Sequence, residues 1–519
     1  MASNTDARGW RATLRSFRHP RVITMLFLGF AAGLPILLIF SSLSLWLREA
    51  GVQRAAVTFF SWAALGYAFK FVWAPLIDRL PVPILTRVLG RRRAWILVAQ
   101  GLIIVAILGM ALTDPARSEA SLTLMALAAV LLGFSSATQD IVIDAYRIES
   151  AATDLQTMMS ATYIAGYRIG MLVAGAGALF LAGSFGTEMG QYSYQAWRWT
   201  YALMAATMLV GVTTTVLIPE PVVQHHGDAT GHSTQDYLRF MLLFGLAASG
   251  FIGMFFFSAA VVGPLKHALS SNGGQHHVVG FAVEALRLGT ALLAACLVAW
   301  AAMAARVADR GMVQTAYLDP VRDFFQRYGI RTAWLLLALV GSYRISDIVL
   351  GVIANVFYQD LGFSKVEIAA IVKTFGLLMT IGGGFLGGVL AVRYGVIRIL
   401  FLGAFLSAAT NLLFMLLAHM GHDTLMLYVV ISADNLSAGL ASAAFVAFLS
   451  SLTSVSFTAV QYAIFSSLMT LFPKLLGGYS GSMVESMGYP GFFLLTTLLG
   501  LPVLVIVWRA RQHLEVKNL

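Results

Sequence analysis

The stretch GFSSATQDIVIDAYRIES (133–150) places two acids and a base in a segment that is otherwise apolar. Asp140, Asp144 and Arg147 stand at positions i, i+4 and i+7, which is one stripe of an α-helix. Gln139 lies about 100° around the same helix, close enough to share a cavity wall. Two acids this close repel each other when both are ionised, so that one of them can hold a proton near neutral pH. The spacing therefore predicts a proton-coupling site at Asp140 and Asp144.

The composition indicates that this helix lies in a lipid bilayer. Of the 519 residues, 59% are hydrophobic and only 11% are charged, whereas a soluble domain has about 25% charged residues. Ionisable groups at membrane depth are costly, and they face a bundle interior or a wet cavity. The acids are thus expected to mark a transport path. For Asp144 and Arg147, an ion pair at the interfacial end of the helix is the structural alternative.

The net charge of +10 does not indicate a nucleic-acid partner. The basic residues form short clusters between apolar runs, which is typical of cytoplasmic loops in membrane proteins. The single cysteine, Cys296, excludes an intramolecular disulfide. No Walker A or G-x-S-x-G motif points to an ATP-driven pump or a hydrolase of that type. We expect no enzyme activity, no cofactor and no metal, and the histidines of 225–232 are interpreted as loop residues.

Apolar runs of about 20 residues predict membrane spans. Fourteen runs qualify: 22–47, 56–77, 94–113, 121–145, 158–183, 197–218, 237–263, 279–304, 333–357, 366–392, 397–418, 424–450, 456–476 and 489–509. Arginine clusters before the first run, in 79–93, in 305–332 and after 508 predict that both termini face the cytoplasm. The charged linker segment YLDPVRDFFQRYG (317–329) favours a helix on the inner membrane surface, with a solvated loop as the alternative.

The two halves of the sequence contain a repeat. WLREAGVQRAAVTFFS after the first run matches FYQDLGFSKVEIAAIV after the ninth, with Gly51 against Gly362. Two halves of six spans in the same orientation form a parallel transporter repeat. The predicted fold is an all-α integral membrane protein with two six-helix bundles and two extra transmembrane helices between them. The predicted domains are 1–218, an inserted pair in 219–304, a cytoplasmic linker in 305–332, and 333–519.

The turn after the second span of each half resembles the major facilitator signature G-x-x-x-D-R-x-G-R-R. In the first half, Asp78 and Arg79 fit and Ala74 replaces the leading glycine. In the second half, Arg393 fits and Val392 replaces the acid. We assign Asp78, Arg79, Arg147 and Arg393 to gating or packing.

Polar side chains in other spans are expected to face the same interior. The residues assigned to substrate binding are Gln139, Tyr67, Lys70, Arg168, Asp347, Lys373 and Asn435. Arg168 is expected to pair with Asp140 or Asp144, or to bind an anionic substrate. Lys70 has a snorkelling alternative, and Lys373 and Asp347 have the alternative of neutralising each other. Small residues in LGFAAGLP, with Gly29 and Gly33, favour close helix packing and smooth surfaces for movement.

Several long motifs together resemble the AmpG family of muropeptide permeases, within the major facilitator superfamily. They are GFAAGLP, FKFVWAPLIDR, GRRRAW, SATQDIVIDAYR, GYRIGMLVAG, VRDFF, KTFGLL and AAFVAFLSSL. The resemblance runs from about residue 18 to 511 and is weakest over 237–304. Gly29, Gly33, Ala137 and Gln139 match positions important for function in that family.

This resemblance implies a permease of the bacterial inner membrane that imports N-acetylglucosaminyl-1,6-anhydro-N-acetylmuramyl peptides with protons, for peptidoglycan recycling. Through the cytoplasmic pool of these fragments it would influence β-lactamase induction. A monomer in the lipid bilayer is expected. The alternative is a major facilitator transporter of another solute, such as an acyl-CoA, a sugar or a drug. A non-transporting membrane sensor or enzyme is disfavoured by the two-half repeat.

Overall fold

The structure is a computed structural model in which helices supply the regular structure. It describes residues 17–52, 67, 69–151, 153–187, 190–221, 234–270, 276–364, 367–477 and 479–517. These ranges contain no β-strand, which confirms the all-α class. Helices are expected in lipid because every backbone N–H and C=O must be bonded within its own segment.

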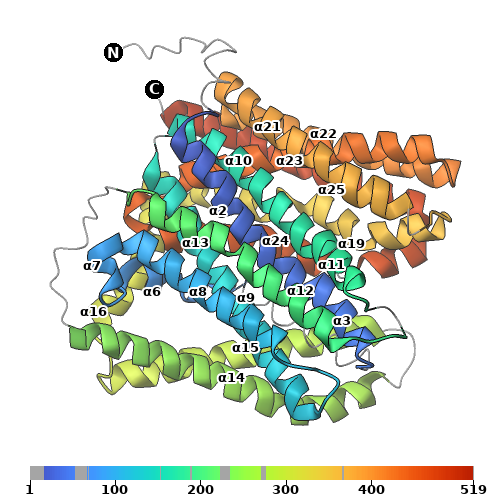
Figure 1. The fold of residues 1–519 in the computed structure, drawn as a ribbon. Coiled ribbons are helices and arrows are strands. Elements are labelled where there is room, and N and C mark those ends of the chain that lie inside the picture. Colours follow the sequence, from blue (N-terminus) through green and yellow to red (C-terminus); the bar gives the residue numbers. More distant parts are fainter. Residues whose placement is uncertain are drawn as a thin grey trace. The chain divides into compact units, whose positions relative to one another are not determined.

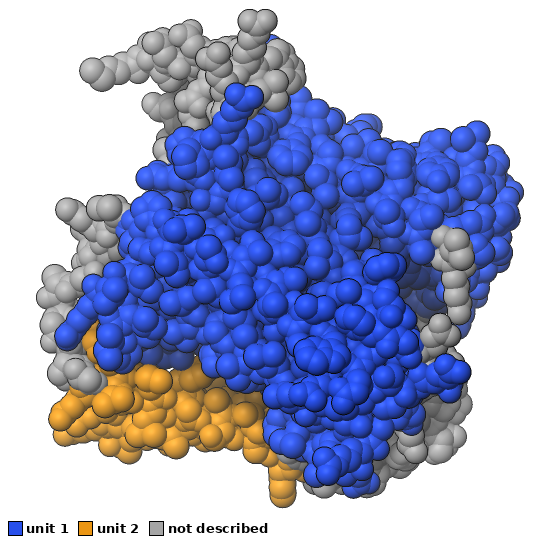
Figure 2. All heavy atoms as spheres, in the orientation of Figure 1, with its two compact units in different colours: residues 1–224, 324–519 blue, residues 225–323 orange. Residues whose placement is uncertain are grey.

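The chain separates into two compact units (Figure 2). One consists of Met1–Gln224 with Phe324–Leu519, and the other of His225–Asp323. The larger unit thus holds the helices of both predicted repeats. The smaller unit holds the long helices that separate the repeats in the sequence.

Figure 1 shows the helices coloured along the chain and labels many of them. Those of the first repeat are α2 (Pro20–Leu37), α3 (Leu43–Glu49), α6 (Ala74–Arg79), α7 (Leu85–Leu89), α8 (Arg91–Ala111), α9 (Glu119–Ser150), α10 (Thr153–Leu172), α11 (Ala178–Ser184), α12 (Tyr194–Thr207) and α13 (Leu209–Leu217). Those of the second repeat are α18 (Ile330–Ser342), α19 (Ile345–Asp360), α21 (Gly376–Tyr394), α22 (Val396–Met420), α23 (Thr424–Leu452), α24 (Thr458–Gly477) and α25 (Ser480–Lys517).

Between the repeats, α14 (Thr234–Ser270) packs against α15 (His276–Ala304). The short helix α16 (Arg310–Val313) and then α17 (Asp319–Tyr328) follow. The helix predicted in the charged linker is present as α17, so the loop alternative for this segment is wrong.

Twelve helical segments of the described chain are long and apolar enough to cross a membrane. They correspond to twelve of the fourteen predicted runs. The run 56–77 lies mostly outside the described residues, and the run 279–304 contributes only the shorter apolar helix Gly289–Ala304. The number of fourteen spans therefore stays a prediction.

The repeat seen in the sequence has a structural counterpart at the ends of α3 and α19. Gly51 and Gly362 both have positive φ, at 79° and 87°. After each glycine, a backbone N–H bonds back across the last helical turn, from Val52 to Leu47 O (2.9 Å) and from Phe363 to Tyr358 O (3.1 Å). Glycine adopts this left-handed conformation without steric penalty, and it is the usual residue after a helix end of this kind. The aligned glycines thus end equivalent helices.

Several spans depart from a regular α-helix. Segments η1 (Leu38–Ser42), η4 (Val173–Gly177) and η6 (Ile368–Phe375) are π-helical. The span Ile330–Asp360 is interrupted between α18 and α19, at Tyr343 and Arg344. Short π segments and broken membrane helices are frequent at functional sites, so these irregularities point to where a site lies.

Helices α2 and α10 pack in direct backbone contact. A Cβ added at Gly29 would lie 2.2 Å from Tyr163 O, and one at Gly33 would lie 2.0 Å from Tyr167 O. Gly166 on α10 approaches the backbone of α2 equally closely, at Leu26 O. This contact fixes the position of α10, which carries tyrosines and an arginine of the candidate site.

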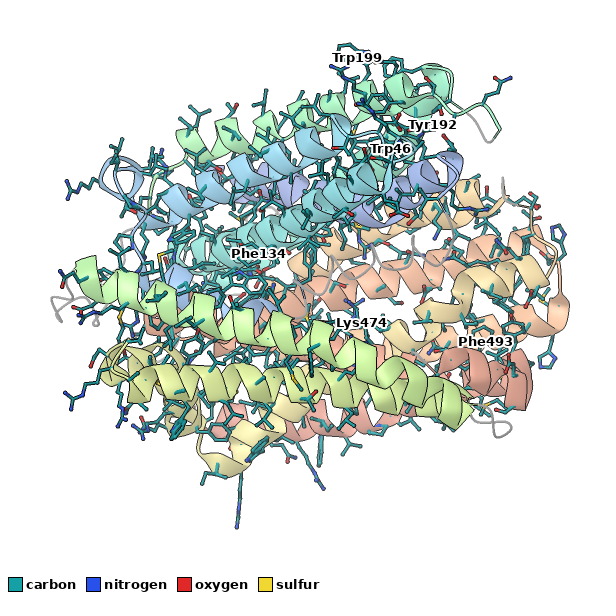
Figure 3. All side chains as sticks on the ribbon, turned by 90° about the horizontal axis from the view of Figure 1, so that it is seen from below. Trp46, Phe134, Tyr192, Trp199, Lys474 and Phe493 are labelled. Atoms are coloured by element: carbon teal, nitrogen blue, oxygen red, sulfur yellow. The ribbon has the colours of Figure 1, made fainter. Side chains whose placement is uncertain are left out.

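One end of the first repeat, which we call the aromatic end, is defined by Trp46, Tyr192 and Trp197. Trp46 and Trp197 stack with ring centroids 5.5 Å apart. Trp46 Nε1 donates to Tyr192 Oη (3.2 Å), and these two side chains meet in Figure 3. Trp197 Nε1 donates to Glu49 Oε2 (2.7 Å). The polar tips of the rings are satisfied, so this end is a fixed structural cap.

Candidate functional site

The polar stripe of α9 is enclosed by protein. Gln139 and Arg147 are 0% exposed, Asp140 is 8% exposed and Asp144 is 6% exposed. Arg147 Nη2 lies 3.2 Å from Asp144 Oδ1. The ion pair named as the structural alternative therefore forms, but it is buried inside the protein and not exposed at an interface.

Arg147 also connects the two repeats. Its Nη1 donates to Ser160 Oγ on α10 (2.9 Å) and to Ser450 Oγ on α23 (2.7 Å). The guanidinium lies over the ring of Tyr462 on α24, 5.3 Å from its centroid. A single buried cation thus holds an acid and a hydroxyl of its own repeat and two side chains of the other.

Asp140 lies in a different environment. Polar groups surround it, but one of its carboxylate oxygens makes no hydrogen bond with the described residues. Lys70, which is buried, and Asp144 both act on it electrostatically. Tyr67 from the second predicted span and Tyr163 and Tyr167 from α10 lie within the same electrostatic range.

Within the described chain, the polar atoms that lack a hydrogen-bond partner at this position belong to Asp140 and Gln139. Asp140 Oδ1 and both amide atoms of Gln139 are buried without a hydrogen-bond partner among the described residues. Tyr67 Oη, in contrast, donates to Ser136 Oγ (2.6 Å). Leaving a buried polar atom unpaired costs about 1–3 kcal/mol. A group that binds here, whether a proton or a polar ligand atom, would remove that penalty.

A second charged network occupies the end of the bundle that we call the basic end, defined by Asp78, Arg92 and Glu149. Arg92 is fully buried; its Nη2 lies 2.8 Å from Asp78 Oδ1 and its Nε donates to Glu149 Oε2 (2.9 Å). Asp78 Oδ2 accepts the backbone N–H of Val460 (3.1 Å), in the first turn of α24. An acid at a helix N-terminus is favourable because of the free N–H groups and the helix dipole there. Asp78 therefore joins the first repeat to the second.

Arg168 does not pair with Asp140 or Asp144, contrary to one of the two sequence expectations. The charged group that acts on it is Arg344 of the second repeat. Arg344 Nε lies 3.1 Å from Asp347 Oδ2, and its Nη1 donates to Ser442 Oγ (2.8 Å). Asp347 also accepts a hydrogen bond from Ser407.

Lys373 and Asn435, which were also assigned to substrate binding, lie on spans of the second repeat. Lys373 is exposed in η6 and Asp347 pairs with Arg344 instead, so the alternative that Lys373 and Asp347 neutralise each other is wrong. Asn435 Oδ1 accepts from Thr380 Oγ1 (2.8 Å) and its Nδ2 donates to Ile431 O (3.0 Å). The amide of Asn435 is therefore engaged in packing α21 against α23.

The positions assigned to gating or packing lie at helix contacts or helix ends. Gly29 and Gly33 form the α2–α10 contact, and Ala137 is completely buried. Arg79 ends α6, and Arg393 lies over the ring of Tyr394 near the end of α21, 5.6 Å from its centroid.

Sequence reasoning missed the residues that complete the basic end. Arg92 counted only as part of a basic loop cluster, and Glu149 was not considered. Glu220 was missed as well, although it accepts the backbone N–H groups of Arg92 (2.7 Å) and Arg93 (3.0 Å) and so caps α8. The available signal was an acid at the end of the fourth span and another at the end of the sixth, on the same predicted side as the arginines.

Metal-ligating residues do not gather in the part of the chain that the structure describes. No group of three or more His, Cys, Asp or Glu side chains there could hold a metal ion. The histidines of 225–232 lie outside the described residues.

Comparisons with known proteins agree with this architecture. The family model described as Major Facilitator Superfamily matches residues 25–342. The chain is 29% identical over 500 residues to a putative transporter AmpG 4 of Rickettsia felis, covering 96% of this chain and 99% of that protein. It is also 29% identical over 503 residues to the anhydromuropeptide permease of Escherichia coli K12, covering 97% of this chain and 82% of that protein.

A solved structure shares the fold at low sequence identity. The proton:xylose symporter XylE, bound to 6-bromo-6-deoxy-D-glucose, matches with a TM-score of 0.57 and 12% identity, covering 96% of both chains. Twelve candidate spans, the parallel repeat, the family model and this fold agree. The chain is a multi-pass membrane transporter and belongs to the Major Facilitator Superfamily.

Proposed function

We propose that this transporter imports anhydromuropeptides, namely N-acetylglucosaminyl-1,6-anhydro-N-acetylmuramyl peptides, across a bacterial inner membrane. The similarity to the Escherichia coli anhydromuropeptide permease along 97% of the chain supports this substrate class. The arginine-rich clusters of the sequence support an orientation with both termini in the cytoplasm. Import would feed peptidoglycan recycling and, through the fragment pool, influence β-lactamase induction.

The observation that carries the proposal of proton coupling is the unpaired oxygen of Asp140 beside Lys70. Because Asp140 Oδ1 has no hydrogen-bond partner among the described residues, a proton can bind there without breaking an existing bond. The unpaired amide of Gln139 on the same helix can exchange hydrogen bonds with a sugar or peptide amide. Proton and substrate would thus bind at neighbouring residues, as coupling requires.

The links between the repeats support a mechanism of alternating access. Asp78 bonds to the first turn of α24, and Arg147 bonds to Ser450. A path that opens at the basic end must break both links, whereas binding at Asp140 and Gln139 leaves them in place. We propose that these links keep the basic end closed until proton and substrate are bound.

The test is uptake of labelled anhydromuropeptide into proteoliposomes. One charge moved through 100 mV supplies about 2.3 kcal/mol, which sustains a gradient of roughly 50-fold per proton. We expect the wild type to accumulate substrate, and Asp140→Asn to exchange it without accumulating it. Glu119→Gln, at the exposed start of the same helix, is the control and keeps accumulation.

Wild-type accumulation by Asp140→Asn would contradict the coupling assignment. Uptake that a sugar, a drug or an acyl-CoA blocks, but an anhydromuropeptide does not, would contradict the substrate class.

A further inference from the structure

Arg168 and Arg344 are two cations near the middle of two spans in different repeats. Arg168 belongs to the span Leu155–Ser184 and Arg344 to the span Ile330–Asp360. Helix α10, which carries Arg168, packs against α23, and Arg344 donates to Ser442 of that same α23. The two guanidinium groups are close enough to repel each other. The two cations therefore lie near each other where α10 packs against α23.

Arg168 has an unused guanidinium. It makes no hydrogen bond or ion pair with the residues that the structure describes, and it is partly exposed although it lies at mid-span. The arginines that serve structure in this chain differ from it, because Arg92 pairs with Asp78 and Arg147 pairs with Asp144. An unpaired cation at this depth is costly unless it serves a ligand.

Arg344 is only partly satisfied, and it occupies the break in its span. Its Nη1 donates to Ser442, and its Nε lies 3.1 Å from Asp347 Oδ2 but makes no hydrogen bond with the described residues. It is also the residue that precedes α19, so the positive end of the dipole of α19 adds to its charge. Broken membrane helices in transporters direct such ends at anionic substrate groups.

We propose that Arg168 and Arg344 together bind a carboxylate of the substrate, and that this carboxylate draws the two repeats together. The inference rests on the proposed function, because anhydromuropeptides carry peptide carboxylates. Guanidinium groups bind carboxylates through paired hydrogen bonds. Asp347 and Asp434 both act electrostatically on Arg344, whereas no acid of the described residues is among the groups that act on Arg168. An anion of the substrate would therefore neutralise Arg168. Without the anion the two cations repel, and with it they share a partner. Substrate binding therefore favours the state in which the repeats close around it.

The experiment compares two substrates in proteoliposomes: an anhydromuropeptide with free peptide carboxylates, and the same molecule with those carboxylates converted to carboxamides. We expect the wild type to have a KM at least about tenfold lower for the carboxylate form, as a hydrogen bond to a charged group implies. In Arg168→Gln the ratio of the two KM values should approach one. Arg168→Lys keeps the charge but loses the paired geometry, so it should retain an intermediate ratio.

Arg322→Gln is the matched control, because Arg322 is an exposed arginine outside the spans. It should keep the wild-type ratio. Arg344→Gln is the second variant, and the yield of monodisperse protein reports whether loss of its pairing with Asp347 prevents folding.

The outcomes separate the two proposals. A wild type that transports neither form contradicts the proposed function. A wild type that transports both forms with equal KM overturns the carboxylate site and leaves the proposed function standing. An unchanged KM ratio in Arg168→Gln also overturns the site, because recognition of the carboxylate would then lie elsewhere.

Discussion

At the residue scale, the buried charges of the first repeat fall into two groups with different uses. Arg92 and Arg147 are enclosed, and each has at least one acid and further hydrogen bonds. Asp140 keeps an unpaired oxygen, and the partly exposed Arg168 has no hydrogen bond or ion pair among the described residues. The first group holds helices together. The second group has the binding capacity that a transported solute or a proton needs.

The pair Asp144–Arg147 gives a residue-scale prediction about stability. Arg147→Gln should lower the free energy of unfolding by about 3–5 kcal/mol, because it leaves the charge of Asp144 buried without its cation. Adding Asp144→Asn should restore part of this loss, since no uncompensated charge then remains. Thermal unfolding in detergent measures both variants. Arg322→Gln removes an exposed pair and should change stability by less than about 1 kcal/mol. A double variant less stable than Arg147→Gln would refute this account.

At the element scale, the α2–α10 contact depends on glycine at specific positions. Gly33→Ala places a methyl group 2.0 Å from Tyr167 O, so the two helices must separate. We expect a loss of about 1–3 kcal/mol from such overpacking. Gly101→Ala on α8 meets nothing within 4 Å and should gain up to about 1 kcal/mol from helix propensity. Equal melting temperatures for the two variants would show that α2 and α10 are not held this closely.

Hydropathy predicted most of the membrane spans. It could not predict the irregular segments, because these depend on the neighbouring helices. Apolar length is a property of a single segment, so twelve runs could be recognised without knowledge of their neighbours. The interruption at Tyr343 and Arg344 contains no proline, and the nearby Gly341 alone does not predict a break, because many glycines of this chain lie inside continuous helices. It depends on what packs around it, as do the π segments. Asn435 was assigned to substrate binding because it is a polar residue in an apolar span; its partner Thr380 lies on another helix, so this pairing could not be recognised from the sequence.

At the scale of the whole molecule, the repeat and the superfamily could be predicted, but the contacts between repeats could not. Arg147 and Ser450 are far apart in sequence, and so are Asp78 and Val460. No sequence period connects such residues, because the contact forms only when both bundles are folded and one end is closed. For the same reason the sequence left open whether Arg168 pairs with Asp140 or Asp144 or binds an anionic substrate, and it did not predict that Arg344 of the other repeat acts on Arg168.

The closed basic end gives a prediction for the molecule as a whole. Asp78→Asn removes the charge that binds both Arg92 and the first turn of α24. A carboxylate in a partly buried position at a helix N-terminus contributes up to about 2 kcal/mol, which corresponds to roughly a 30-fold change in the ratio of closed to open states. Spin labels on the two repeats at the basic end should therefore report longer distances in Asp78→Asn. Asp114→Asn is the matched control, since Asp114 accepts from Tyr192 at the aromatic end (2.7 Å), and its distances should equal those of the wild type. Unchanged distances in Asp78→Asn would mean that Arg147 and the helix contacts suffice to keep the basic end closed.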